Sequence, residues 1–258
     1  MSAARWSIVA LVVLTVVSFA VGFAWLPSEH GDFTAKGLWD TICRAAGVPQ
    51  KWSAGAPAAA TRSTRVVLDA SMQRPQAQDA IGRGATLALN CTMCHGPRGL
   101  SQANAPNLAG QYPEVIIKQL MDYRGGDRAS SIMQALAANL SDANIRDLAA
   151  YYTYLPRPRN APVTDMSIVP ALVRVGDPMH NVAPCAACHG GIERKPGAPW
   201  LEGMPKEYLV EQLAAFAAGK RHNDSHGQMR NMARNLTPQQ IEEVALFYAR
   251  HGEGEEGR

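Results

Sequence analysis

The sequence predicts an all-α protein in which one transmembrane helix precedes two tandem copies of a helical domain. Three observations predict this: an uncharged apolar run near the N-terminus, a repeat of about 95 residues, and apolar residues at helical spacing in both copies. The chain has 258 residues, which is enough for two domains of about 100–200 residues each.

Composition excludes several broad classes. The chain is 47% hydrophobic and 18% charged, which excludes wholesale disorder and a long coiled coil. Its net charge is only +3, so we expect no nucleic-acid partner. The five cysteines are few and odd in number, which argues against a disulfide framework.

Residues 1–28 are predicted to be a transmembrane anchor. From Trp6 to Leu26 the sequence has no charged residue, and as a helix this run would be about 31 Å long, close to a bilayer core. Trp6 and Trp25 lie near its ends, where tryptophan favours the membrane interface. Arg5 precedes the run, which predicts that the rest of the chain is exported. The alternative is a cleaved signal peptide, whose apolar core is normally shorter, about 7–15 residues.

Residues 29–78 form a segment between the anchor and the first repeat, which we call the preamble. Its later part is rich in Ala, Ser, Gly and Thr and is predicted to be a linker. Its first part predicts a short helix with an apolar face made by Phe33, Leu38, Trp39 and Ile42. Because such a helix is too short to be stable alone, we expect this face to dock on a partner. Cys43 beside it is interpreted as a small buried hydrophobe, with a free thiol or an intermolecular disulfide as alternatives.

The two repeats are assigned to residues 79–156 and 169–258, with a proline-containing linker at 157–168 between them. Both copies have the same buried helical face, made by Ile116, Ile117, Leu120 and Tyr123 in the first and by Leu209, Val210, Leu213 and Phe216 in the second. Ser141 and Thr237 are predicted N-caps of the last helix of each copy.

Each copy contains one Cys-x-x-Cys-His motif, the attachment signature of c-type haem. The motif residues are Cys91, Cys94 and His95 in the first copy, and Cys185, Cys188 and His189 in the second. Two thiols on one side of a tight turn can form thioethers to two vinyl groups, and the adjoining histidine then ligates the iron. A zinc site would use both cysteine pairs together, and a redox pair would favour a βαβ context. The sequence therefore predicts two covalently attached c-type haems.

The second axial ligands are predicted to be Met133 and Met229. Each stands seven residues before the leucine of a Leu-Ser or Leu-Thr pair, and this agreement between copies favours them. Met232 is an alternative to Met229, and His222 or His226 would give ligation by two histidines. Thioether ligation raises the haem potential and fills both axial positions. The sequence thus predicts an electron carrier and not an enzyme.

These motifs make both copies resemble class I cytochrome c domains, and the tandem pair resembles the cytochrome c4 family of dihaem electron carriers. The resemblance covers about residues 80–155 and 170–250 and includes a Pro-x-Leu turn after each haem motif. It implies that the carbonyl oxygens of Pro106 and Pro199 accept hydrogen bonds from the two haem-ligating histidines. It also implies that the two domains face each other with the haem propionates near their interface.

Arg128 and Arg221 occupy matching positions near the predicted haem edges. They are interpreted either as partners of the propionates or as solvated side chains.

The predicted function is single-electron transfer in a respiratory chain, from a quinol-oxidising complex to a haem–copper terminal oxidase. The predicted location is the bacterial inner membrane, with a single pass and with the haem domains in the periplasm. Two alternatives stay open: an integral cytochrome c subunit of a larger membrane oxidase or dehydrogenase, and a dihaem peroxidase-like enzyme. The matched methionines argue against the peroxidase-like enzyme, because it needs an open iron coordination site.

Overall fold

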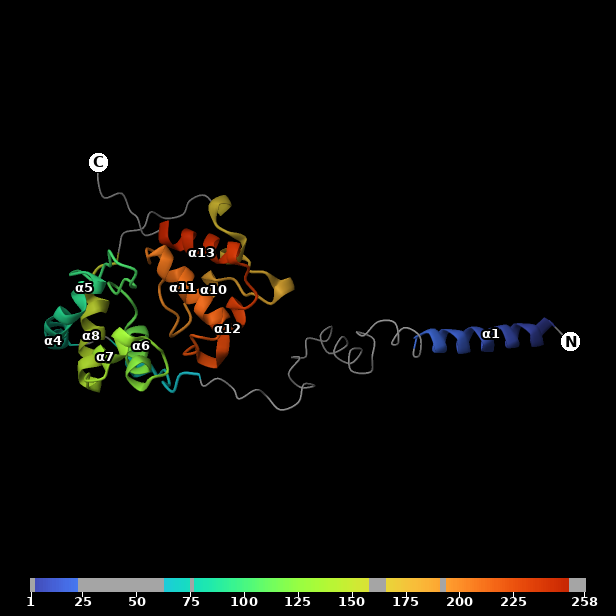
Figure 1. The fold of residues 1–258 in the computed structure, drawn as a ribbon, viewed down its shortest axis with the longest axis horizontal. Helices are drawn as coiled ribbons and strands as arrows, with labels where there is room; N and C mark the ends of the chain where they lie inside the picture. Colours follow the sequence, from blue (N-terminus) through green and yellow to red (C-terminus); the bar gives the residue numbers. More distant parts are fainter. Residues whose placement is uncertain (1–2, 23–62, 75–76, 158–165, 191–193, 251–258) are drawn as a thin grey trace. The chain divides into compact units, whose positions relative to one another are not determined.

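The structure is a computed structural model that describes residues 3–22, 63–74, 77–157, 166–190 and 194–250 (Figure 1). The chain divides into two compact units, Met1–Ala60 and Thr61–Arg258. Within the described residues the regular structure is helical, apart from one isolated antiparallel bridge between Asp177 and Val182. The all-α prediction with two tandem domains is confirmed.

The first unit contains helix α1, Ala3–Ala20, whose large apolar side chains are exposed. No helix in the described part of the chain is both long enough and apolar enough to span a membrane. The predicted single-pass location in the inner membrane is therefore wrong. The described helix has 18 residues, Ala3–Ala20, whereas the predicted run of 21 residues continues to Leu26, beyond the described part. The predicted preamble helix and Cys43 lie outside the described residues.

The first domain of the second unit is built from α4 (Gln78–Ala88), α5 (Thr92–His95), α6 (Pro113–Gly125), α7 (Ser131–Ala137) and α8 (Asp142–Tyr154). Two short 3-10 helices, η4 (Ala70–Gln73) and η5 (Leu89–Cys91), precede α4 and α5. The core includes Ile116 and Ile117 of α6 and the fully buried Ile145 of α8. Ser141 is the N-cap of α8, as predicted, and it also forms a capping box with Asn144.

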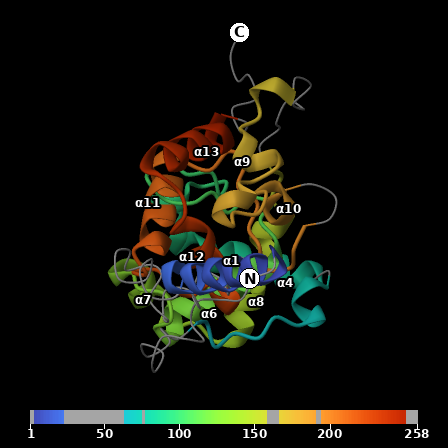
Figure 2. The ribbon, with the colours of Figure 1, turned by 90° about the vertical axis from the view of Figure 1, so that its right-hand side faces the viewer.

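The second domain contains α9 (Ala171–Arg174), α10 (Ala186–His189), α11 (Lys206–Ala217), α12 (Gln228–Ala233) and α13 (Pro238–Arg250). Its 3-10 helices are η6 (Met166–Ile168), η7 (Pro178–His180) and η8 (Ser225–Gly227). Figure 2 shows α11 beside α13, with α9 near α10 and α13. The Thr237 hydroxyl accepts from the Gln240 amide at 3.2 Å, and the Gln240 side chain accepts from the Thr237 amide at 2.8 Å. The second predicted cap is therefore present as well.

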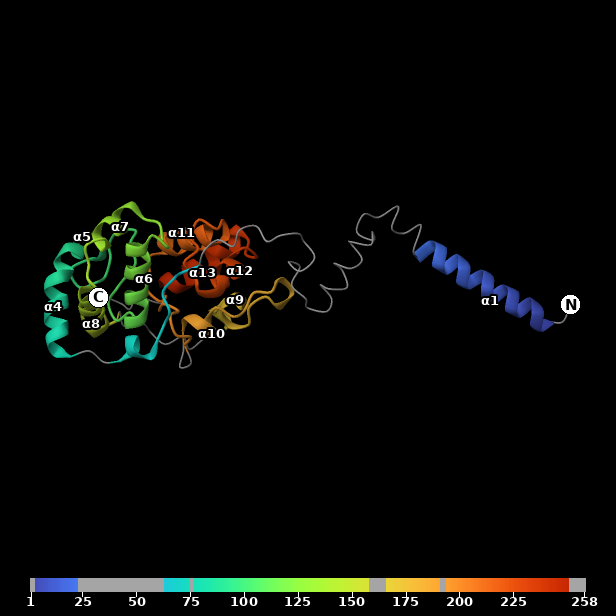
Figure 3. The same ribbon diagram turned by 90° about the horizontal axis from the view of Figure 1, so that it is seen from below.

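The two domains lie side by side (Figures 1 and 3), and polar side chains of α6 and α11 contribute to the surface between them. The linker predicted at 157–168 begins with Arg157, whose guanidinium stacks on the rings of Tyr112 at 4.6 Å and Trp200 at 4.4 Å. Because these aromatic residues belong to different domains, the start of the linker is itself part of the interface.

The crossing of α4 over α8 depends on Gly84. A Cβ atom at this position would lie 2.0 Å from the carbonyl oxygen of Asp147 and 2.8 Å from the Cβ of Tyr151. We expect Gly84→Ala to lower the free energy of unfolding by about 1–3 kcal/mol, because the two helices must separate. Gly82 of the same helix has nothing within 4 Å of such a Cβ, so Gly82→Ala should be neutral or stabilising by up to about 1 kcal/mol. Thermal unfolding followed by circular dichroism compares the two, and equal stability would contradict the packing described.

Candidate haem sites

The first haem motif forms one tight turn. Cys91 ends η5, and Cys94 and His95 lie in the single turn of α5, so the spacing puts all three on one side of the chain. Gly96 ends this turn with φ +75°, and a Cβ there would lie 2.0 Å from the carbonyl oxygen of Leu100. Only glycine fits this close approach, which folds the chain back beneath the motif.

The His95 ring is buried, and its Nδ1 lies 2.8 Å from the carbonyl oxygen of Pro106. An Nδ1–H donated to this carbonyl leaves Nε2 with its lone pair as the ligating atom. Burial lowers the pKa of His95 and keeps the imidazole neutral, which is the form that binds a metal.

The second motif repeats this geometry. Cys185 caps α10, which contains Cys188 and His189. The His189 Nδ1 lies 3.0 Å from the carbonyl oxygen of Pro199, and burial again lowers the pKa of the ring. The four cysteines of the two motifs are free thiols and not disulfides. Burial raises the pKa of the Cys185 thiol to about 11.

Orphaned polar atoms lie beside both motifs. Among the described residues, the Tyr248 hydroxyl and the Nε1 of Trp200 are buried without a hydrogen-bond partner, and the buried Tyr152 hydroxyl has only the Cys91 thiol beside it. Burial raises the pKa of both tyrosines, whose phenols lie near Cys91 in the first domain and Cys185 in the second. Buried polar groups are normally paired, so these atoms fit a bound group that brings its own polar edge. Together with two thiols and a histidine at each site, this donor set fits a covalently attached haem.

The described residues do not support a zinc site. They contain no group of three or more His, Cys, Asp or Glu side chains placed to hold a metal ion. A structural zinc site would need four such ligands close together.

The candidate axial methionines occupy equivalent short helices. Met133 lies in α7, where its amide donates to the capping hydroxyl of Ser130 at 3.2 Å, and Met229 lies in α12. Both are half-buried. The sulfur of Met232 instead accepts from the amide of Ala183 at 3.3 Å, and its side chain packs on the core of the second domain. This places the alternative methionine in a structural contact.

The two histidines considered as alternative ligands lie between α11 and α12. His226 is exposed, with φ +54°, and His222 is half-buried. The exposure of His226 disfavours its use as an axial ligand.

Arg128 and Arg221 are not solvated but meet at the domain interface. Arg128 donates to Gln119 at 2.8 Å and to Gln212 at 2.8 Å, and Arg221 donates to Gln212 at 2.7 Å. In the described part of the chain their hydrogen-bond partners are amide and phenol oxygens and not carboxylates. Burial and the neighbouring Arg128 lower the pKa of Arg221 to about 10. Arg128 is buried and Arg221 is half-buried, and neither forms a hydrogen bond to a carboxylate among the described residues.

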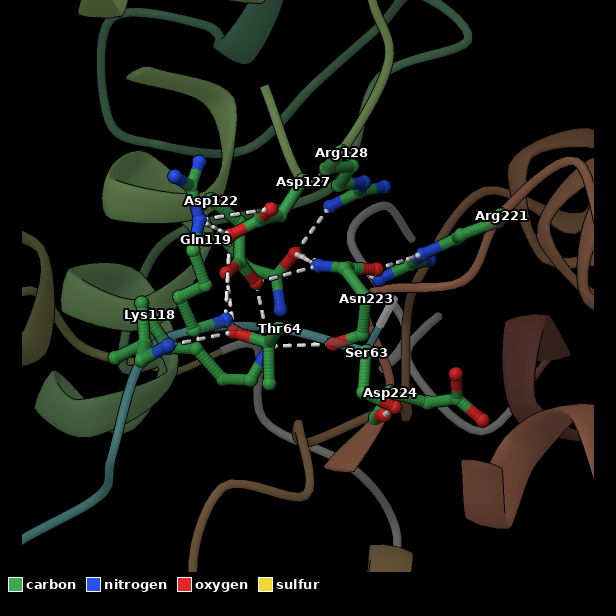
Figure 4. Close-up of polar contacts among 12 residues, drawn as sticks. Ser63, Thr64, Lys118, Gln119, Asp122, Asp127, Arg128, Arg221, Asn223 and Asp224 are labelled. Carbon is green, nitrogen blue, oxygen red and sulfur yellow. Dashed lines mark hydrogen bonds and ion pairs between the residues drawn. The ribbon is translucent and has the colours of Figure 1, made fainter. Parts of the chain in front are cut away.

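Sequence reasoning missed a buried polar cluster at the same interface (Figure 4). Lys118 and Asp122 of α6 form an ion pair at 2.5 Å, with side chains 4% and 0% exposed. The Lys118 ammonium also donates to the carbonyl oxygen of Asn223 in the second domain at 2.6 Å. One signal was available in the sequence: the repeat aligns Lys118 and Asp122 with Glu211 and Ala215, so the pair belongs to the first copy alone.

Two helical domains, each with a Cys-x-x-Cys-His turn and a histidine held by a proline carbonyl, define the class of c-type cytochromes with two haems. The family model for cytochrome c matches residues 81–155 and 181–248, and the chain belongs to this family.

Among similar proteins, cytochrome c4 of Thiocapsa roseopersicina is 37% identical over 67% of this chain and 90% of its own length. The thiosulfate dehydrogenase electron acceptor of Stutzerimonas stutzeri is 35% identical over 66% of this chain and 83% of its own length. The crystal structure of reduced cytochrome c4 from Pseudomonas stutzeri superimposes with a TM-score of 0.59 and 28% identity, covering 66% of this chain and 97% of that one. The protein is therefore a cytochrome c4-like dihaem electron-transfer protein, and its two domains carry covalently bound c-type haem.

Proposed function

We propose that this protein carries single electrons between redox enzymes of a respiratory chain, as a free carrier or as the electron-transfer subunit of a complex. The observation that carries the proposal is the repeated geometry of the two haem motifs, with each histidine ring held by a proline carbonyl 2.8 Å or 3.0 Å away. When bound, each haem supplies an iron that alternates between the ferrous and ferric states.

In this proposal the protein attaches each haem through two thioethers and ligates its iron through one histidine and one methionine. The first site uses Cys91, Cys94, His95 and Met133; the second uses Cys185, Cys188, His189 and Met229. Methionine at the sixth position favours the ferrous state, and it leaves no open position for a substrate. This ligand set supports electron transfer and disfavours a peroxidase-like activity.

The carbonyl oxygens of Pro106 and Pro199 fix the two histidine rings, and the hydrogen bond raises the basicity of the ligating nitrogen. Arg128 and Arg221 are proposed to hold the propionate groups near the domain interface. Arg128 is buried and Arg221 half-buried, and neither bonds to a carboxylate among the described residues; this supports the role, since a cation that loses water needs its charge compensated.

Two classes of partner are proposed. The first is a quinol-oxidising complex as donor and a haem–copper oxidase as acceptor. The second is a thiosulfate-oxidising dehydrogenase as donor. The similarity of this chain to the thiosulfate dehydrogenase electron acceptor of Stutzerimonas stutzeri favours it. Stopped-flow reduction of the purified protein by each donor decides between them, because the physiological donor should reduce it far faster than the other.

Met133→Leu and Met229→Leu test the proposed ligands. Each should abolish the near-red sulfur-to-iron band of one ferric haem and lower its potential by on the order of 100 mV, since axial ligands set haem potentials over about 0.8 V. Met232→Leu is the matched control, because its sulfur accepts from the Ala183 amide, and it should keep both bands. Optical redox titration measures both quantities. Loss of the band in Met232→Leu with an unchanged spectrum in Met229→Leu would show that the ligand is misassigned.

A further inference from the structure

A short segment before the first haem domain contacts both domains. It comprises residues 63–73, which we call the strap, and it lies outside the residues that match the cytochrome c family, 81–155 and 181–248. Figure 4 shows Ser63 and Thr64 of the strap next to the buried cluster of α6 and Asn223. The strap therefore precedes the part of the chain that matches the family.

The strap is bonded to the first domain through a buried carboxylate. The Thr64 hydroxyl donates to Asp122, whose side chain is fully buried. Asp122 also accepts from Lys118 at 2.5 Å and from the Asn223 side chain at 2.7 Å. One carboxylate thus joins the strap, α6 and the second domain. Hydrogen bonds to a charged group are stronger than neutral ones, and they are costly to remove when the group is buried.

Arg65 adds a second bond to the first domain. Its amide and its Nε lie 3.2 Å and 2.9 Å from Oδ2 of Asp127, and its guanidinium also donates to the carbonyl oxygen of Gly125. Asp127 is almost fully buried, and its pKa is lowered by the hydrogen bonds from Arg65 in spite of the opposing effect of its burial.

The strap is bonded to the second domain on both sides of these contacts. The Ser63 hydroxyl donates to the carbonyl oxygen of Asp224 at 2.9 Å and accepts from Arg230 at 3.0 Å. Further along, Leu68 packs on Gly197, where a Cβ would lie 2.3 Å from the Leu68 Cδ1. The strap therefore contacts the second domain, then the first, then the second again, and its last part, η4, packs on α6 of the first domain.

The carboxylates that bind the strap break the symmetry of the repeat. The repeat aligns Asp122 with Ala215 and Asp127 with Lys220, so the second copy offers no equivalent acceptors. The strap therefore has one way to bind.

Domains of one chain are expected to move relative to each other unless the interface between them is large and apolar. The interface between these two haem domains is polar, so its side chains alone would not be expected to fix their orientation.

We propose that the strap locks the two haem domains in one relative orientation, so that the path between the haems stays fixed. The consequence, a fixed path for electron transfer between the domains, rests on the proposed function. The docking of the two domains by the strap does not, because it depends only on contacts within the chain.

The test uses the full-length holoprotein with Thr64→Val, which keeps the shape of the side chain and removes the donor to Asp122. Hydrogen exchange of residues 219–230 should become about tenfold faster, because losing a hydrogen bond to a charged group favours undocking by about that factor. Thr86→Val is the matched control: the Thr86 hydroxyl is exposed and, among the described residues, bonds to the carbonyl oxygen of Gly82 in its own helix at 3.3 Å. It should leave this exchange unchanged.

A second variant, Ser63→Ala with Arg65→Ala, removes the side-chain hydrogen bonds of these two residues but keeps the one from the Arg65 amide to Asp127, and it should increase the exchange at least as much. Unchanged exchange in both strap variants would overturn the proposal. An equal acceleration of hydrogen exchange in the core of α8 would also overturn the proposal. Such a result would mean that the strap stabilises the first domain itself and does not hold the two domains together. The haem content and the redox titration of the same samples report on the proposed function separately.

Discussion

Replacing Cys91 and Cys94 by alanine is expected to leave one covalently bound haem per chain instead of two. The two thiols lie on one side of a single turn, and residues 79–156 contain no other cysteine to form a thioether. The second domain carries its own motif and should keep its haem. Mass spectrometry of the denatured protein measures the number of haems directly.

Met93 provides the matched control for this experiment. It lies between the two cysteines, and its side chain is 92% exposed, so Met93→Ala should keep both haems. Retention of two haems by the double cysteine variant would contradict the assignment of the first attachment site.

Replacing Lys118 by methionine is expected to lower the free energy of unfolding by about 3–5 kcal/mol, the usual cost of leaving one partner of a buried ion pair uncompensated. Asp122 would keep its hydrogen bonds from Thr64 and Asn223 but would lose the only cation that bonds to it among the described residues. The carbonyl oxygen of Asn223 would lose its donor at the same time. The effect should therefore appear at the domain interface as well as in the first domain.

Urea denaturation of the holoprotein measures this loss. Lys206→Met is the control, because Lys206 forms an ion pair with Glu242 at 2.7 Å in which both side chains are substantially exposed. Removing an exposed pair should cost only about 0–1 kcal/mol. A loss of the same size in both variants would contradict the view that the buried pair organises the interface.

The features that sequence reasoning predicted are local. Apolar spacing gave α6 and α11, and the capping boxes at Ser141 and Thr237 follow from residues three positions apart. The proximity of each motif histidine to its proline carbonyl also depends on a short loop, 11 residues in the first domain and 10 in the second. Repetition of the pattern made each assignment stronger than one copy alone would allow.

The features that sequence reasoning missed depend on how distant segments meet. The shared glutamine partners of Arg128 and Arg221 have no signal in the sequence, because only domain docking brings these side chains together. The contact between Thr64 and Asp122 joins residues 58 positions apart and has no periodic signature.

Reductive titration of the wild-type holoprotein under anaerobic conditions tests the central claim most directly. With two haems that each have both axial positions filled, the protein should take up two electrons per chain, and its reduced form should not bind carbon monoxide. Uptake of a single electron, or a carbon monoxide complex at either iron, would contradict the assignment of this protein as a carrier with two haems.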